Sequence, residues 1–379
     1  MSLRLLILTS STGGGHDMRA RALRAWVTKE TDWEVTIHQT LESTHGLYGF
    51  GVELYNFIQR VVPVAHHAYF QFLELAGMHR RADRILGADR FMGSLEAARP
   101  DLIVSTHAHL NPGFFELARR FDSKITCGTY CGELYGGYGF SRYWVNPAAD
   151  FFLGAVRPCT EQALELGMPE ANASTAGFLL RPDFYEGDHD PEERNRLLED
   201  ELSLNADLPT ILLATGAVGA NNHLSLLRCL EQRRCKLQVI ALCGHDSALF
   251  NKVQQWGERA EYVEVRPLAR REDMRRLIRS VDLLMARPGT GTTSEAIICG
   301  TPIIFNGIGG VMPQEYLTVK FARQVGFGPV VYWPYQLARL MDRISADASL
   351  LPGWQAAVES ARPREHPRLI LDHLARATA

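Results

Sequence analysis

Short apolar runs that alternate with helical patterns, in two successive series, constrain the fold of this chain more than any other feature. The first series predicts strands at 3–9, 34–38, 102–105, 124–129 and 151–155, and the second predicts strands at 210–214, 238–242, 262–265, 283–285 and 302–305. Buried runs separated by helices are typical of parallel α/β units. Since the pattern restarts in a chain of 379 residues, longer than most single domains, we predict an α/β protein with two Rossmann-like domains.

The two domains are expected to meet at Gly177–Pro182, because the stretch that follows, 186–203, is strongly polar. This places an N-terminal domain at 1–176 and a C-terminal domain at 177–379. Within the polar stretch, Asp188 and Asp190 form a DxD motif of the kind that binds metal ions. Asp190 and Pro191 followed by two glutamates are more typical of a helix start, so we favour the helix and predict no metal site.

Charge and cysteine content argue against several classes of protein. Forty basic and forty-three acidic residues give a net charge of −3, which does not favour a dedicated nucleic-acid-binding protein. The seven cysteines are odd in number and form no CxxC motif, so we expect reduced thiols in a cytosolic protein rather than disulfides or a zinc ribbon. No uncharged apolar stretch reaches the roughly eighteen residues of a membrane span, and we expect a chain that is soluble or lies on a membrane without crossing it.

An aromatic segment at 47–78 leaves two interpretations open. Phe50, Leu54, Phe57, Ile58 and Val61 recur at helical spacing, which predicts one apolar helix face, and a basic cluster follows at 79–84. The segment is either a helix pair packed on its own domain, or an interfacial anchor whose apolar area and positive charge favour an anionic membrane.

The loop after the first expected strand carries the first chemical signal. Residues 9–16 are Thr-Ser-Ser-Thr-Gly-Gly-Gly-His, and glycines before a helix N-terminus let an anionic ligand approach the backbone. Met18 takes the place of the third glycine of the dinucleotide fingerprint, so NAD binding is not favoured. His16 is either a general base for a hydroxyl group or a histidine bonded to local backbone.

The C-terminal half has two loops of the same kind. Residues 287–296, Arg-Pro-Gly-Thr-Gly-Thr-Thr-Ser-Glu-Ala, join an expected strand to a helix predicted at 293–299. Residues 289–293 would present N–H groups and hydroxyls to a diphosphate. Glu315 ends the loop 309–315 after the next strand, and its carboxylate either accepts the hydroxyls of a ribose or is an acidic residue in a first helical turn.

Together these segments resemble the glycosyltransferases that include monogalactosyldiacylglycerol synthase and the processive diacylglycerol glucosyltransferases. The enzyme that adds N-acetylglucosamine in peptidoglycan lipid synthesis is a more distant relative. The resemblance covers most of the chain, and it is carried by the loop ending in His16, the strand end Pro100–His107, the linker Gly177–Phe184 and, most closely, Arg287–Pro302.

The resemblance implies a GT-B fold, in which two Rossmann-like domains face each other across a cleft and the last helix crosses back to the first domain. It implies inverting, metal-independent transfer of a hexose from a UDP-sugar, with no cofactor, to a diacylglycerol-like lipid. The enzyme would be cytoplasmic and peripherally associated with the inner face of the membrane through about residues 47–90. His16 would act as base or organise the oxyanion, and the donor would be held by Gly14, Gly15, Gly216, Gly219, Arg287, Gly289, Thr290, Gly291, Thr292, Gln314 and Glu315.

Departures from the family pattern keep other readings open. Tyr130 stands where the family usually has the aspartate of a Thr-Asp pair, and Glu133 is the only carboxylate between Cys127 and Asp150. Glu133 either replaces the missing carboxylate as a catalytic residue or is a solvated loop residue. The alternatives for the whole chain are a UDP-sugar enzyme with a soluble acceptor, a UDP-sugar 2-epimerase, and a nucleotide-sugar-binding protein without catalysis.

Overall fold

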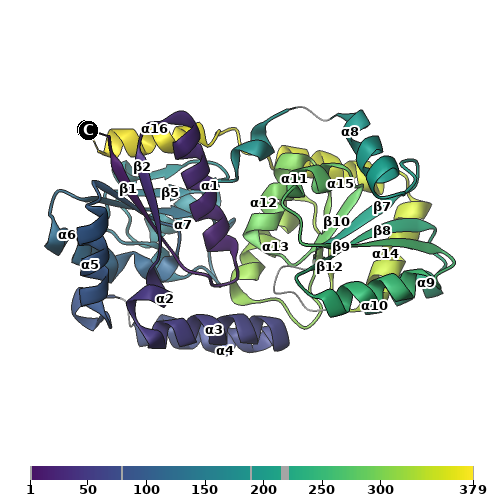
Figure 1. Cartoon of the computed structure of the whole chain (residues 1–379), viewed down its shortest axis with the longest axis horizontal. Coiled ribbons are helices and arrows are strands. Elements are labelled where there is room, and N and C mark those ends of the chain that lie inside the picture. The colour runs from purple at the N-terminus through teal and green to yellow at the C-terminus, as the bar shows by residue number, and fades with distance from the viewer. Residues whose placement is uncertain (1, 78–79, 188–189, 215–221, 379) are drawn as a thin grey trace.

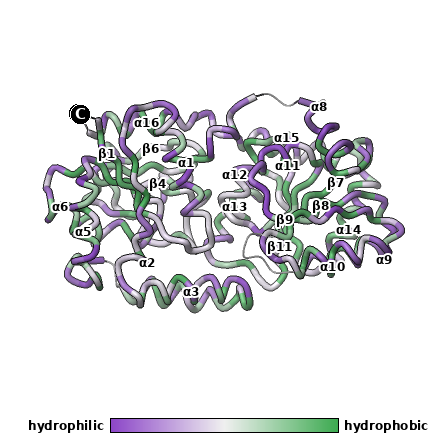
Figure 2. Tube along the Cα trace, in the orientation of Figure 1, coloured by the Kyte–Doolittle hydropathy of each residue, from purple (hydrophilic) through white to green (hydrophobic). Residues whose placement is uncertain are grey.

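Two parallel sheets of six strands each lie side by side along the long axis of the molecule (Figure 1). The structure is a computed structural model that describes residues 2–77, 80–187, 190–214 and 222–378. Helices pack around both sheets, and Figure 2 shows hydrophobic residues concentrated in the strands between them. The predicted α/β class with two Rossmann-like halves is confirmed.

The first sheet has the strand order β2-β1-β3-β4-β5-β6. Its strands are β1 (Arg4–Thr9), β2 (Glu34–Gln39), β3 (Leu102–Ser105), β4 (Thr126–Cys131), β5 (Phe151–Gly154) and β6 (Ala173–Thr175). The helices of this half are α1 (Gly15–Glu30), α2 (Thr40–Thr44), α3 (Gly46–Val61), α4 (His66–Ala76), α5 (Ala88–Ala98), α6 (Pro112–Phe121) and α7 (Arg157–Glu165).

The second sheet has the order β12-β11-β10-β7-β8-β9. Its strands are β7 (Thr210–Ala214), β8 (Leu237–Gly244), β9 (Val263–Ala269), β10 (Leu283–Ala286), β11 (Ile303–Asn306) and β12 (Val330–Val331). The helices that follow β6 are α8 (Pro191–Asn195), α9 (His223–Gln232), α10 (Ser247–Gly257), α11 (Met274–Arg279), α12 (Thr290–Cys299), α13 (Pro313–Val325), α14 (Pro334–Ala346), α15 (Leu350–Ser360) and α16 (Arg368–Ala377).

All the expected strands are present, with ends displaced by four residues or fewer. The sequence did not predict β6 and β12, which have three and two residues. Neither is a continuous buried apolar run: β6 is Ala-Ser-Thr and only half-buried. Edge strands of this length leave no periodic signal, because their hydrogen bonds to one neighbour define them rather than their side chains.

The last helix returns to the first sheet. Figure 1 shows α16, in yellow, beside α1, where Arg368 Nη2 lies 2.9 Å from Glu30 Oε1. The hydroxyl of Thr126, at the start of β4, donates to the carbonyl of Ala377 over 3.4 Å. The chain therefore crosses between its halves twice, once between β6 and β7, where the predicted boundary after residue 176 falls, and once before α16.

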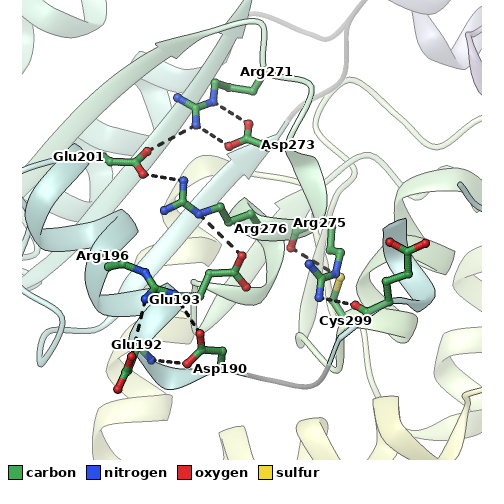
Figure 3. A network of polar contacts seen from close by, with 11 residues as sticks. Asp190, Glu192, Glu193, Arg196, Glu201, Arg271, Asp273, Arg275, Arg276 and Cys299 are labelled. Carbon is green, nitrogen blue, oxygen red and sulfur yellow. Dashed lines mark hydrogen bonds and ion pairs between the residues drawn. The ribbon is translucent and has the colours of Figure 1, made fainter. Parts of the chain in front are cut away.

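An ion-pair network holds the polar stretch after β6 against the second sheet (Figure 3). The Asp190 carboxylate accepts from the Glu192 N–H at 2.9 Å, as an N-cap does, and lies 3.0 Å from Arg196. Arg276 on α11 lies 2.6 Å from Glu201. The predicted helix start at Asp190 is confirmed, whereas Asp188 lies outside the described residues.

The strand orders place the loops after β1, β3 and β10 at the centre of the molecule. The order changes direction between β1 and β3 in the first sheet and between β7 and β10 in the second. Ligands of open α/β sheets bind outside the carboxyl ends of strands at such switch points. The loops after β1, β3 and β10 are described, and they carry most of the residues singled out from the sequence.

Candidate active site between the two halves

His16 lies in the first turn of α1, directly after the glycine turn that ends β1. Gly14 precedes the helix with φ of 79°, a left-handed conformation that favours glycine. His16 Nδ1 is 2.7 Å from the carbonyl oxygen of Thr106, and the His16 ring packs against His107 and Trp144 at centroid distances of 4.3 and 5.7 Å.

The contact with Thr106 assigns the proton on the His16 ring. A carbonyl can only accept, so Nδ1 carries the hydrogen and Nε2 keeps its lone pair. Burial, aided by the positive charge of Arg19, lowers the pKa of His16 to about 4. The ring is therefore neutral at pH 7, and its free nitrogen can accept a hydrogen bond.

Glu133 lies two residues after β4 and is buried, with 8% of its surface exposed. Burial raises the pKa of Glu133 to about 7, against the opposing effects of the Arg19 charge and a hydrogen bond from the Trp144 side chain. Within the described part of the chain, Glu133 Oε2 has no hydrogen-bond partner. The solvated-loop reading of Glu133 is wrong, and a carboxylate with a pKa near neutrality is suited to proton transfer.

The loop after β10 opens directly into a helix that faces the first half. The helix predicted at 293–299 starts three residues earlier, at Thr290. The first N–H groups of a helix have no partner within it, so those of Thr290, Gly291 and Thr292 are available to an anion. This earlier start strengthens the case for a diphosphate site, since the partial positive charge of the helix end falls on the glycine–threonine run itself.

Arg287 and Glu315 are bound to each other. Arg287 Nε donates to Glu315 Oε1 at 3.0 Å and its Nη2 donates to Oε2. Arg287 also donates to the carbonyls of Ile308 and Gly310, at 3.2 and 2.8 Å. Glu315 accepts from the Met312 N–H at 2.8 Å, as the first-turn reading expects. Both side chains therefore hold the loop before α13 in place.

One cavity of about 320 Å³ collects the predicted residues from both halves. All the predicted site residues that the structure describes line this cavity, namely Gly14, Gly15, His16, Glu133, Arg287, Gly289, Thr290, Gly291, Thr292, Gln314 and Glu315. Gly216 and Gly219 lie outside the described residues. Figure 1 shows α1 and α12 facing each other at this point.

Among the lining residues that were not predicted, Arg19, Tyr55 and Glu295 carry ionisable side chains. Arg19 follows His16 by three residues on a helix, a spacing that places both on one face. Glu295 stands inside the 287–296 motif, and burial raises its pKa to about 7. The Gln314 side chain donates to the Tyr55 hydroxyl, a contact between the two halves that no local pattern predicts.

A second, apolar cavity of about 150 Å³ opens on the same catalytic candidates. It lies between α3, α4 and the loop after β3, with Leu41, Val52, Phe70 and Leu73 in its wall. The two cavities share five lining residues, namely Thr12, His16, Tyr55, Glu133 and Gln314. A polar chamber and an apolar chamber thus meet at His16 and Glu133.

A larger groove of about 1290 Å³ lies at the other end of the second sheet, around the starts of β7, β8 and β10. Several of its basic side chains are paired with acids: Arg194 with Asp282 at 3.1 Å, and Arg233 with Asp342 at 2.7 Å. It is remote from the carboxyl ends of the strands, so its size does not make it the candidate active site.

Proteins of known or assigned activity resemble this chain in sequence and in fold. No family model matches the chain. A probable monogalactosyldiacylglycerol synthase 2 of Oryza sativa subsp. japonica is 26% identical over 362 residues, covering 89% of this chain and 73% of the rice protein. The processive diacylglycerol beta-glucosyltransferase of Staphylococcus carnosus is 23% identical over 266 residues, covering 70% of this chain and 64% of that protein.

The chain is a homologue of these diacylglycerol glycosyltransferases. Its fold is GT-B: Acinetobacter baumannii MurG matches with a TM-score of 0.63 at 17% identity, over 99% of both chains. Anabaena Alr3699/HepE, solved with UDP-glucose, matches with a TM-score of 0.54 at 14% identity over 98% of both chains. The family resemblance read from the sequence is therefore confirmed.

Proposed function

We propose that this homologue transfers a hexose from a UDP-sugar to a diacylglycerol-like lipid, with inversion and without a metal ion. The observation that carries the proposal is the meeting of a polar and an apolar cavity at His16 and Glu133. The names of the rice and staphylococcal relatives supply the acceptor class, and the UDP-glucose of the HepE structure supplies the donor class.

In the proposed reaction the donor diphosphate lies on the first turn of α12, with its sugar toward His16. The acceptor oxygen attacks the anomeric carbon from the side opposite the diphosphate. The new carbon–oxygen bond forms as the bond to the β-phosphate oxygen breaks, and that oxygen keeps the electron pair. The N–H groups of Thr290, Gly291 and Thr292, with the helix dipole, stabilise the departing charge.

The proton of the acceptor hydroxyl passes to the carboxylate of Glu133, which lies with His16 beside Trp144. His16 Nε2 is free to accept a hydrogen bond from that hydroxyl, since Nδ1 is engaged by Thr106. The raised pKa of Glu133 gives this carboxylate the proton affinity that His16 lacks. Both side chains touch Trp144, so we propose that His16 orients the hydroxyl and that Glu133 accepts its proton.

Membrane contact is proposed through α3, the turn that follows it, and α4. The apolar stripe predicted for this segment is only partly buried: Phe50, Phe57 and Val61 are exposed, whereas Leu54 and Ile58 are half-buried. On α4, Phe72 and Leu75 are exposed too, with Leu75 at 80%. Arg80, Arg81 and Arg84 nearby are exposed too. No helix among the described residues is long and apolar enough to cross a bilayer. Apolar side chains beside basic ones suit an anionic membrane surface.

The deciding experiment supplies UDP-glucose, UDP-galactose or UDP-N-acetylglucosamine with diacylglycerol in anionic vesicles, with and without EDTA. We expect UDP release that requires the lipid and survives EDTA, and a β-linked glycolipid from an α-linked donor, identified by mass spectrometry and proton NMR. A change of the sugar without any acceptor would indicate a 2-epimerase, and UDP binding without turnover would indicate a non-catalytic protein.

Vesicle flotation tests the membrane surface separately. Phe57→Ser combined with Leu75→Ser is expected to abolish co-flotation with anionic vesicles while leaving UDP affinity unchanged. Phe121→Ser, which changes an exposed phenylalanine on α6 of the same half, is the matched control. Equal flotation of the double variant and the control would contradict the proposed surface.

A further inference from the structure

A guanidinium from the first half of the chain lies against the helix start of the second half. Arg19 lies on α1, one turn after His16, and lines the same cavity. Only 5% of its surface is exposed. Its Nη2 donates to the carbonyl of Gly132 at 3.0 Å and to the hydroxyl of Thr290 in the first turn of α12.

The path of this side chain depends on a glycine. A Cβ at residue 132 would lie 1.9 Å from Arg19 Nε and 2.1 Å from Cζ, closer than any side chain allows. The backbone of Gly132 thus lets the guanidinium cross the loop that carries Glu133 and reach the other half. The guanidinium is therefore held beside the proposed diphosphate site before any ligand binds.

The charge of Arg19 is not neutralised by its bonded partners. Among the described residues, both hydrogen-bond acceptors of its guanidinium, the Gly132 carbonyl and the Thr290 hydroxyl, are uncharged. An arginine has five N–H donors, and a buried cation is unfavourable without a full counter-charge. The charge of Arg19 acts on the nearby Glu133 carboxyl, but burial raises the pKa of that carboxyl to about 7, so Glu133 offsets the cation only in part near pH 7. The cavity therefore presents a preplaced positive group where an anionic ligand would complete its bonding.

We propose that Arg19 binds the diphosphate of the donor and stabilises the negative charge that develops on it as the sugar leaves. This inference rests on the proposed function and deepens it. As the bond from the anomeric carbon to the β-phosphate oxygen breaks, the electron pair stays on that oxygen. A guanidinium already in place stabilises this charge without reorganising, and it takes part of the role that a divalent cation has in other sugar-nucleotide enzymes.

The alternative is that Arg19 is only a strut that supports the 132–133 loop, and the choice of ligand separates the two. Arg19→Gln removes the charge and keeps an amide donor, while Arg19→Lys keeps the charge. Arg21→Gln changes an exposed arginine on the same helix and serves as the control. Each variant is titrated with UDP and with uridine, which has no phosphate.

Arg19→Gln is expected to weaken UDP binding by about tenfold to a hundredfold, the range for a hydrogen bond to a charged group, and to leave uridine affinity unchanged. Arg19→Lys should recover part of the loss, and Arg21→Gln should bind both ligands like the wild type. With a UDP-sugar and acceptor, kcat should fall more than KM rises, because the charge on the diphosphate grows in the transition state.

Two results would overturn the inference while the proposed function stands: UDP binding by Arg19→Gln equal to that of the wild type, or equal losses for UDP and uridine. Unchanged uridine binding also shows that the variant is folded. A wild-type protein that binds no UDP would instead refute the proposed function, and the role of Arg19 with it.

Discussion

Glu133→Gln is expected to stabilise the protein and inactivate it. The carboxyl is buried, its Oε2 lacks a partner among the described residues, and burial raises its pKa from 4.5 to about 7. At 1.36 kcal/mol per pKa unit, this difference means that ionised Glu133 costs the folded protein about 3 kcal/mol. Glutamine has nearly the same shape and no charge, so it avoids that cost.

The sign of the effect sets its pH dependence. Below about pH 4.5 the Glu133 carboxyl is protonated in both the folded and the unfolded chain, and the substitution changes little. Between about pH 4.5 and pH 7 the folded chain keeps a proton that the unfolded chain has lost, so this contribution to stability declines as pH rises. Above pH 7 it is lost, and Glu133→Gln gains its full advantage there.

Urea unfolding of both proteins, followed by tryptophan fluorescence, measures the difference in unfolding free energy at about pH 5 and pH 8.5. We expect a small difference at the lower pH and about 3 kcal/mol in favour of Glu133→Gln at the higher pH. Glu161→Gln, which changes an exposed carboxylate paired with Arg157, should show no such trend. A difference that is the same at both pH values, or a variant less stable at pH 8.5, would refute the burial argument.

Three further outcomes follow from the same geometry. His16→Ala should lower kcat by about 10²- to 10⁴-fold with UDP affinity kept in calorimetry, and full turnover would exclude His16 from orienting the acceptor hydroxyl. Gly289→Val adds a side chain whose Cβ meets nothing within 4 Å, so the thermal midpoint should stay near the wild type while UDP affinity falls, and unchanged affinity would argue against a diphosphate there. Arg287→Met leaves Glu315 buried without its cation, which should cost about 3–5 kcal/mol in urea unfolding, and adding Glu315→Gln should restore part of that loss.

The fold was predictable because its strands are locally encoded. Leu5, Ile7 and Val104 belong to short, wholly buried runs, and such runs between helices admit few architectures. The loops of the cavity were predictable for a related reason. Glycine, threonine and histidine directly after a strand can be recognised from a few consecutive residues. Because the carboxyl ends of parallel strands meet at one edge of the sheet, such loops are expected to lie close together.

The rest depends on groups far apart in the sequence. Arg19 reaches Thr290 only because the halves close on each other, and Arg287 meets Glu315 although they are 28 positions apart in the sequence. Periodicity predicts an apolar face on α3 but contains no information on what covers it. The environment of Glu133 likewise depends on Arg19 and Trp144, which are distant in sequence, so its local sequence could not separate a solvated residue from a catalytic one.

The cavity contains charged and polar groups that lower the stability of the folded protein, and the proposed substrates would bind to these same groups. Among the described residues, the cavity holds the cation of Arg19 with neutral hydrogen-bond acceptors, Glu133 with an oxygen that has no hydrogen-bond partner, and first-turn N–H groups of α12 without helical partners. A diphosphate supplies the anion for Arg19 and for the helix start, and an acceptor hydroxyl supplies the donor for Glu133. Because each ligand removes a cost that the closed protein bears, donor and acceptor should each favour the closed arrangement of the two halves. Variants that remove one of these costs should therefore gain stability and lose the dependence of closure on that ligand.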